Sequence, residues 1–211
     1  MGKRREAPSL SRRVGSRKPK SIVAVVCEGR KTEPNYLNLI KGMSESTILE
    51  LLIIDEPATS PKQIVERACH EKKKSEQLAR QTKDPNAAYD SVWCAFDIDE
   101  HPFIKEACQQ ARDNGIETAI SNPCIEVWFL LHFENRTAQL HRREARRLLE
   151  NYIANYDKTL VALSGMEGKY ADAKKRAQLL DNKHTGDATL FPENNPSSGM
   201  WRLVDHLQIT Y

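Results

Sequence analysis

Two short apolar runs of this chain each end in carboxylates. The run at 22–27 is followed by Glu28, and the run at 92–96 is followed by Asp97 and Asp99. Both runs are β-branched or aromatic and carry no charge, which is typical of strands buried on both faces of a sheet. Acids at such strand ends are unfavourable unless a positive charge compensates them. Because carboxylate oxygens suit hard divalent cations, the pattern predicts a site for Mg²⁺, or for Mn²⁺ in its place.

The spacing of the three acids is compatible with one shared ion. Asp97 and Asp99 are two residues apart, so in an extended chain their side chains point the same way and each can give one oxygen to the ion. Glu28 ends a different strand, and the carboxyl ends of strands in an open α/β sheet are where ligands bind. Alternatively, the three acids have only a structural role, in which Glu28 caps a helix or pairs with Arg30 and the two aspartates close a turn. We favour the site because the acids end buried strands.

Strands and helices alternate in the part of the chain that must position these acids. We expect four strands, at 22–27, 49–54, 91–96 and 116–120. Helices are predicted at 33–42, 60–81 and 102–115, and a fourth begins at Asn122-Pro123 and buries apolar residues up to Leu131. This alternation predicts an α/β fold with a mostly parallel four-stranded sheet and helices on both faces.

The remainder of the chain has a different character. Beyond about residue 135 we predict helices only, at 141–156, 169–180 and 197–207. The expected organisation is therefore a basic disordered arm at 1–20, an α/β core at 21–135 and a helical extension at 136–211 that packs on the core.

Charge and composition limit the function classes. The first 20 residues carry eight Lys or Arg and one Glu, so their net charge is +7. Because the whole chain has a net charge of +3, the remaining residues carry about −4. The arm is expected either to contact phosphates or to act as a solubilising tail. The chain has no apolar run long enough to span a membrane and no signal peptide, and its five cysteines form no CxxC pair. These features favour a cytoplasmic protein whose cysteines serve as core residues.

Taken together, the motifs resemble two related groups of proteins. The EGxxTE motif at 28–33, followed by DxD at 97–99, resembles the Toprim domain, a Mg²⁺-binding α/β module of topoisomerases, primases and several nucleases. The run at 121–133 resembles the SNPxxExWxLxHF signature of the RloB-like family. The segments at 195–198 and 203–207 are similar to the C-terminal part of that family.

The resemblance has several implications. It implies a Toprim-like fold and a role for Glu28 as general acid/base or second metal ligand. It also implies a prokaryotic protein that is associated with phage resistance and that, in some systems, pairs with an AAA-type ATPase.

Five further residues are candidates for the site. Glu126 could be an additional catalytic acid or metal ligand, although an acid in the first turn of a helix also gains from the helix dipole. Ser121 and Asn122 could touch phosphate at that helix N-terminus. Arg30 and Lys31 could neutralise the phosphate to be cleaved, or could belong to a solvated loop.

Other polar residues have a structural explanation as well. His132 lies on an apolar helix, where we expect a core histidine and not a catalytic base. Glu33 is expected to favour a helix start, and Tyr36 to lie in the core. The arginines at 142, 143, 146 and 147 are expected to form a solvated helix face, with phosphate or partner binding as the alternative.

The leading hypothesis is a Mg²⁺-dependent nuclease that acts on DNA or RNA phosphodiesters. Among Toprim proteins, a primase would bring cysteine pairs for zinc, and a topoisomerase would need a further domain with a nucleophilic tyrosine. A phosphotransferase of the haloacid-dehalogenase type would place its DxD after the first strand, followed by Thr or Val, whereas here Glu100 follows. The remaining alternative is a catalytically silent module that binds nucleic acid or a partner ATPase.

Overall fold

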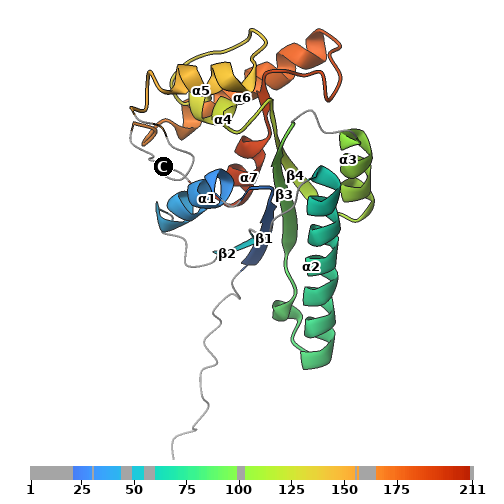
Figure 1. Ribbon diagram of the computed structural model, residues 1–211. Helices are drawn as coiled ribbons and strands as arrows, with labels where there is room; N and C mark the ends of the chain where they lie inside the picture. Colours follow the sequence, from blue (N-terminus) through green and yellow to red (C-terminus); the bar gives the residue numbers. More distant parts are fainter. Residues whose placement is uncertain are drawn as a thin grey trace, which may run out of the picture.

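A computed structural model describes residues 21–29, 31–43, 49–54, 60–98, 103–154, 156 and 165–209 (Figure 1). The strands are β1 (Ser21–Cys27), β2 (Leu49–Ile54), β3 (Ser91–Asp97), β4 (Glu117–Asn122) and β5 (Ser197–Ser198). The α-helices are α1 (Thr32–Met43), α2 (Pro61–Thr82), α3 (Ile104–Asp113), α4 (Glu126–Leu131), α5 (Arg142–Leu149), α6 (Tyr170–Gly186) and α7 (Met200–His206), and a short 3₁₀ helix, η1, covers Pro85–Ala87. The predicted basic arm lies outside the described residues.

The strands form one mostly parallel sheet in the order β2-β1-β3-β4-β5. β1 to β4 are parallel, as predicted, and β5 pairs antiparallel with β4. The fifth strand is a correction to the predicted four-stranded sheet and to the helix predicted at 197–207. β5 has only two residues, which is too short for the alternating pattern that marks a strand in the sequence. The apolar spacing of α7, which follows directly, therefore made the helix seem to begin earlier.

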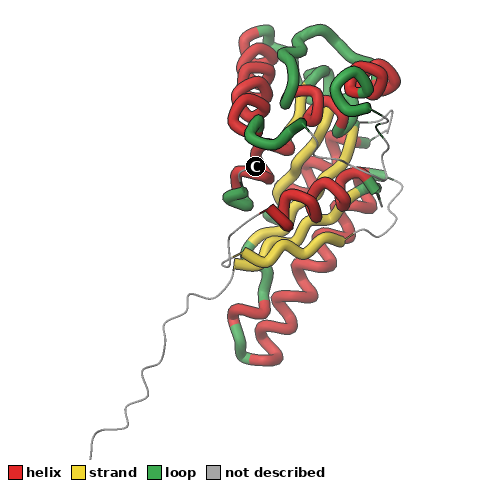
Figure 2. The backbone as a smooth tube through the Cα atoms, turned by 90° about the vertical axis from the view of Figure 1, so that its left-hand side faces the viewer, coloured by secondary structure: helices red, strands yellow, loops and turns green. Residues whose placement is uncertain are grey.

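Helices cover both faces of the sheet, which confirms the predicted α/β class. Alternate side chains of a strand point to opposite faces, so Val23 and Val25 pack into a cluster with α1 and α4 to α7. Ala24 and Val26 pack into a second cluster with α2 and α3. Figure 1 shows α1 on one side of the strands and α2 and α3 on the other, and Figure 2 shows the sheet between them.

The long helix α2 begins where its sequence predicts. The Ser60 side chain accepts a hydrogen bond from the Gln63 backbone N–H at 3.4 Å, and Pro61 occupies the first turn. The helix ends at Thr82, and the next residue, Lys83, caps it in a left-handed conformation with φ of 55°. No helix in the described residues is long and apolar enough to cross a membrane.

Three other helix boundaries differ from the prediction. Asn122 ends β4 and does not cap a helix, because α4 begins only at Glu126. The helix predicted at 141–156 is limited to α5, and turns follow it. The helix predicted at 169–180 continues to Gly186 as α6. Apolar periodicity locates these helices but does not fix their ends, which depend on capping and packing.

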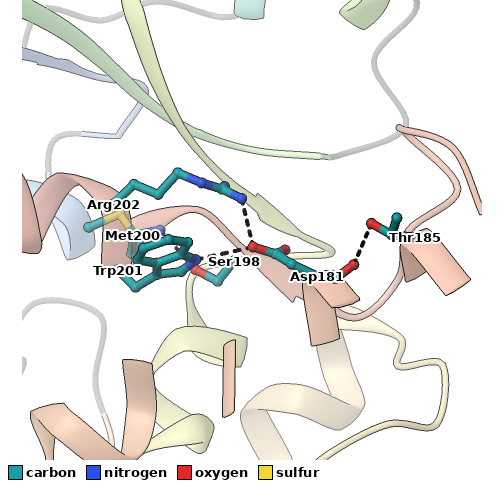
Figure 3. A network of polar contacts seen from close by, with 6 residues as sticks. All are labelled: Asp181, Thr185, Ser198, Met200, Trp201 and Arg202. Carbon is teal, nitrogen blue, oxygen red and sulfur yellow. Dashed lines mark hydrogen bonds and ion pairs between the residues drawn. The ribbon is translucent and has the colours of Figure 1, made fainter. Parts of the chain in front are cut away.

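Side-chain contacts join segments of the C-terminal part of the chain to one another. The Asn195 amide donates to the Leu140 carbonyl and its oxygen accepts from the Leu140 N–H, both at 2.9 Å. Asp181 of α6 accepts from the Arg202 guanidinium at 2.6 Å and from the Trp201 indole N–H at 3.3 Å (Figure 3). The two contacts of Asp181 hold α6 against α7.

Candidate acidic site at the strand ends

The sheet topology places the ends of β1 and β3 side by side. β2 lies on one side of β1 and β3 on the other, so the chain reverses its direction of travel across the sheet between these two strands. In open α/β sheets, such a switch point at the carboxyl ends of the strands is the usual place for a ligand. Glu28 directly follows β1, and Asp97 is the last residue of β3.

A hydrogen bond joins the first two predicted site residues. The Asp97 backbone N–H donates to Glu28 Oε2 at 3.0 Å, and the Glu28 N–H donates to the Ala95 carbonyl at 3.0 Å. Glu28 is half-buried and Asp97 is buried. The structure therefore brings these two acids together, whereas Asp99 lies outside the described residues.

Asp97 lies in a cluster of negative charge. Its pKa is raised well above the usual value, chiefly because burial removes water from the carboxylate, and then because Glu33, Glu126 and Glu28 repel its negative charge. Arg142 opposes these effects. We call Glu28, Glu33, Asp97 and Glu126 the acidic cluster. Its excess of negative charge makes the strand ends a favourable place for a cation.

Glu33 belongs to this cluster although its sequence context suggested only a helix start. It is the second residue of α1 and is 7% exposed. A Cβ atom at Gly29 would lie 3.0 Å from Glu33 Oε2, so the glycine leaves space for this carboxylate. The sequence could have indicated this position. The predicted helix begins a few residues after Glu28, so its first turn lies at the same edge of the sheet as Glu28.

Glu126 reaches the cluster from α4. It is 2% exposed, and its Oε1 accepts a hydrogen bond from the Tyr156 hydroxyl at 3.3 Å. Burial and the nearby Glu126 raise the pKa of Tyr156, so this hydroxyl stays protonated and remains a donor. Burial and Glu126 likewise raise the pKa of the Cys124 thiol. Tyr156 is a contact that the sequence pattern did not indicate, since it lies 30 residues away from Glu126.

One arginine of the predicted solvated helix face contacts the cluster. The Arg142 guanidinium, at the start of α5, lies 3.6 Å from Asp97 Oδ2. Farther along the same helix, Arg146 pairs with Glu150 at 3.7 Å. Sequence periodicity did not separate the two arginines, because the difference arises from how α5 packs over the strand ends.

The predicted phosphate-contacting residues have different environments. Lys31 is exposed just before α1, and Arg30 lies outside the described residues. Ser121 and Asn122 are buried: the Ser121 hydroxyl lies 3.0 Å from that of Ser198, and the Asn122 amide donates to the Pro192 carbonyl at 2.8 Å. These internal bonds give both side chains a structural role, and phosphate contact remains a prediction.

His132 is a core residue, as expected. Its Nδ1 donates to the Trp128 carbonyl at 2.9 Å, and burial lowers its pKa to about 4. The Trp128 indole in turn donates to the hydroxyl of Tyr36, which is also buried, at 2.7 Å. The histidine is therefore neutral at physiological pH, and the bond between Trp128 and Tyr36 fixes α4 against α1.

The chemistry of the acidic cluster suits a hard divalent cation, since its donors are carboxylate oxygens in negative excess. Asp97 would hold the ion together with its acidic neighbours. Among the residues that the structure describes, no group of three or more His, Cys, Asp or Glu side chains is arranged to hold a metal ion. Asp99, the other aspartate predicted to bind the ion, lies outside the described residues.

Comparison with known proteins gives one match. The model of the family described as "RloB-like protein" matches residues 23–207, which extend from β1 to the residue after α7. No curated protein and no solved structure matches the chain.

Proposed function

Since the chain belongs to the RloB-like protein family, we propose that it is a Mg²⁺-dependent nuclease of the Toprim type. It would cleave phosphodiester bonds of DNA or RNA, in phage defence and with a partner ATPase. The observation that carries the proposal is the burial of Asp97 among Glu28, Glu33 and Glu126 at the β1/β3 switch point. A fold retains such unfavourable charge most readily where function requires it.

The proposal gives roles to two residues of the cluster and to three residues outside it. Asp97 would bind the ion, and Asp99, two residues later in the sequence, is proposed as a second ligand. Glu28, which the Asp97 N–H positions, accepts a proton from the attacking water. Arg142 and the exposed Lys31 neutralise the substrate phosphate. When bound, Mg²⁺ would act as a Lewis acid and stabilise negative charge on the phosphate oxygens.

One observation favours a second candidate, a catalytically silent module that binds nucleic acid or a partner ATPase. In the conformation described, and within those residues, the acids are not arranged as a metal-binding set of three. A silent module would keep the fold and the basic residues but would not cleave nucleic acid.

Cleavage assays distinguish the two candidates. Purified wild-type protein is incubated with Mg²⁺ or Mn²⁺ and with DNA, RNA and tRNA, next to the Asp97→Asn and Glu28→Gln variants. We expect the wild type to cut at least one substrate and each variant to lose about 10²-fold or more of that rate. Glu117→Gln is the matched control, because Glu117 is an exposed acid at the opposite end of β4. Equal behaviour of all four proteins would favour the silent module.

A further inference from the structure

A pocket with a volume of about 250 Å³ lies beside the edge strand β5. Residues of β4, β5, α3, α6 and α7 line it, and none of them belongs to the acidic cluster. Ser198, in its wall, pairs with Ser121 of β4, and Ser121 pairs in turn with Asp97 of β3. Two strand spacings, about 10 Å, therefore separate this wall from Asp97. The pocket is a second candidate site, distinct from the first.

Two arginines and one aspartate are the charged side chains that line this pocket. Arg112 of α3 and Arg202 of α7 are exposed, and Asp181 of α6 accepts a hydrogen bond from Arg202 at 2.6 Å. The Arg112 guanidinium donates to Gln109 Oε1 on its own helix at 2.8 Å. Since a guanidinium has five N–H donors, both arginines can bind a ligand as well. The three side chains together carry a charge of +1, which favours an anionic ligand.

Contacts within the protein fix the walls of the pocket. The Arg202 guanidinium lies over the Trp201 ring, 4.7 Å from its centroid, and bonds to Asp181 on its other side (Figure 3). The Asn122 amide donates to the Pro192 carbonyl at 2.8 Å, which holds the loop that precedes β5 and forms a further wall. The pocket is therefore formed in advance of any ligand, as is usual for small-molecule sites.

The other groups of the lining indicate what kind of anion fits. The planar fork of a guanidinium matches a phosphate group. Phe191 and Ile120 contribute apolar surface, and an aromatic ring can stack on a nucleobase. The bonds from Arg202 and from the Trp201 indole both end on Oδ2 of Asp181, which leaves Oδ1 as an acceptor for a sugar hydroxyl. The volume lies just below the lower end of typical small-molecule sites, about 300 Å³, which favours one nucleotide over a dinucleotide cofactor.

We propose that this pocket binds one nucleotide unit. Its phosphate would be held by Arg112 and Arg202, its sugar by Asp181, and its base would lie against Phe191. The unit is either a free nucleoside monophosphate or one nucleotide of a nucleic acid strand. This inference goes beyond the proposed nuclease activity and does not depend on it, because binding in the pocket needs neither a metal ion nor cleavage.

Calorimetric titration in EDTA tests the pocket in the absence of divalent cations. The full-length protein is titrated with AMP, GMP, CMP and UMP, with the matching nucleosides and with inorganic phosphate. We expect at least one nucleoside monophosphate to bind, and its nucleoside and inorganic phosphate to bind at least about tenfold more weakly.

Arg112→Gln is the decisive variant, because this arginine is exposed and its bond to Gln109 lies within one helix, so its loss does not disturb the fold. The substitution should weaken nucleotide binding at least about tenfold, since it removes a charged contact with the phosphate. Arg80→Gln is the matched control and should bind like wild type, because Arg80 is a 79% exposed arginine of α2 that does not line the pocket.

A single-stranded oligonucleotide distinguishes the two sources of the nucleotide. If the mononucleotides do not bind, but the oligonucleotide binds in EDTA and Arg112→Gln weakens its binding about tenfold, the ligand is a nucleotide of a strand. The proposal is overturned if inorganic phosphate binds as tightly as the nucleotides, if neither mononucleotides nor the oligonucleotide bind, or if Arg112→Gln and Arg80→Gln behave alike. Nucleotide binding by a protein that cleaves no nucleic acid would leave the pocket in place and contradict only the proposed function.

Discussion

Asp97 is the residue whose charge state the fold disturbs most clearly. Burial and three neighbouring acids raise its pKa, so the folded protein takes up a proton there more readily than the unfolded chain does. Its contribution to stability is therefore complete below the usual aspartate pKa of about 4 and is lost as the pH rises through the raised pKa.

Replacement of this charge should stabilise the metal-free protein. We expect Asp97→Asn to have a higher midpoint of thermal unfolding than wild type at pH 7 without divalent ions, and the difference to disappear near pH 3. Loss of the ion pair with Arg142, whose guanidinium is 3.6 Å away and partly exposed, offsets only part of the gain. Calorimetry over this pH range provides the test, with Glu117→Gln as control. If the variant is less stable than wild type at pH 7, neighbouring groups compensate the negative charge of Asp97 in the folded protein, and the prediction is wrong.

His132 should produce the opposite dependence on pH. Its folded pKa of about 4 lies below the usual histidine value of about 6.5. The stability that it contributes is present above pH 6.5 and is lost as the pH falls through 4, by about 3 kcal/mol in total. His132→Gln, although less stable at neutral pH, should lose less stability than wild type between pH 7 and pH 4. Parallel denaturant midpoints for the two proteins over that range would contradict this assignment.

At the scale of elements, local patterns in the sequence predicted what local forces determine. The apolar runs located β1 to β4, and the Ser60-Pro61 signal located the start of α2. They also placed Glu28 and Asp97 at strand ends. Arg142 and Tyr156 could not be assigned to the cluster in this way, because their positions depend on how the segment from α5 onward packs over the sheet.

The contact of β5 and α7 with β4 depends on a glycine between them. The Gly199 N–H donates to the Ile120 carbonyl at 2.7 Å, and a Cβ atom at Gly199 would lie 3.0 Å from the Ile120 backbone nitrogen. We expect Gly199→Ala to lower the free energy of unfolding by about 1–3 kcal/mol, because the backbone there cannot move aside easily.

A second glycine provides the control for this substitution. A Cβ atom at Gly186, the last residue of α6, would meet no atom within 4 Å. Gly186→Ala should therefore be neutral or stabilising by up to about 1 kcal/mol. Equal effects of the two substitutions in denaturant titrations would argue against close packing of α7 on β4.

At the scale of the whole molecule, the C-terminal helices share a core with the sheet. Leu37 of α1, Trp128 of α4 and Leu203 of α7 belong to one buried cluster. In Figure 1, α4, α5 and α6 lie beyond the carboxyl ends of the strands, where the acidic cluster is. Residues on both sides of the predicted boundary at 135 therefore contribute to one cluster, and the division into a core and an extension stays a prediction.

Truncation tests whether the extension is required for folding. A chain that ends at residue 135 loses α5 to α7 and exposes the apolar face of α4, so we expect it not to unfold cooperatively. The full chain should unfold in a single calorimetric transition. Near-ultraviolet circular dichroism provides a second readout, since Trp128 should lose its fixed environment in the fragment. A fragment with its own sharp transition would instead establish 21–135 as an independent domain.

The central claim is that carboxylates at the ends of β1 and β3 hold a divalent cation. Anomalous diffraction from crystals soaked in Mn²⁺ tests it most directly. We predict a peak about 2 Å from a carboxylate oxygen of Asp97, which is absent in Asp97→Asn crystals treated in the same way. A well-diffracting wild-type crystal with no peak at the strand ends, or with one remote from Asp97, would contradict the claim.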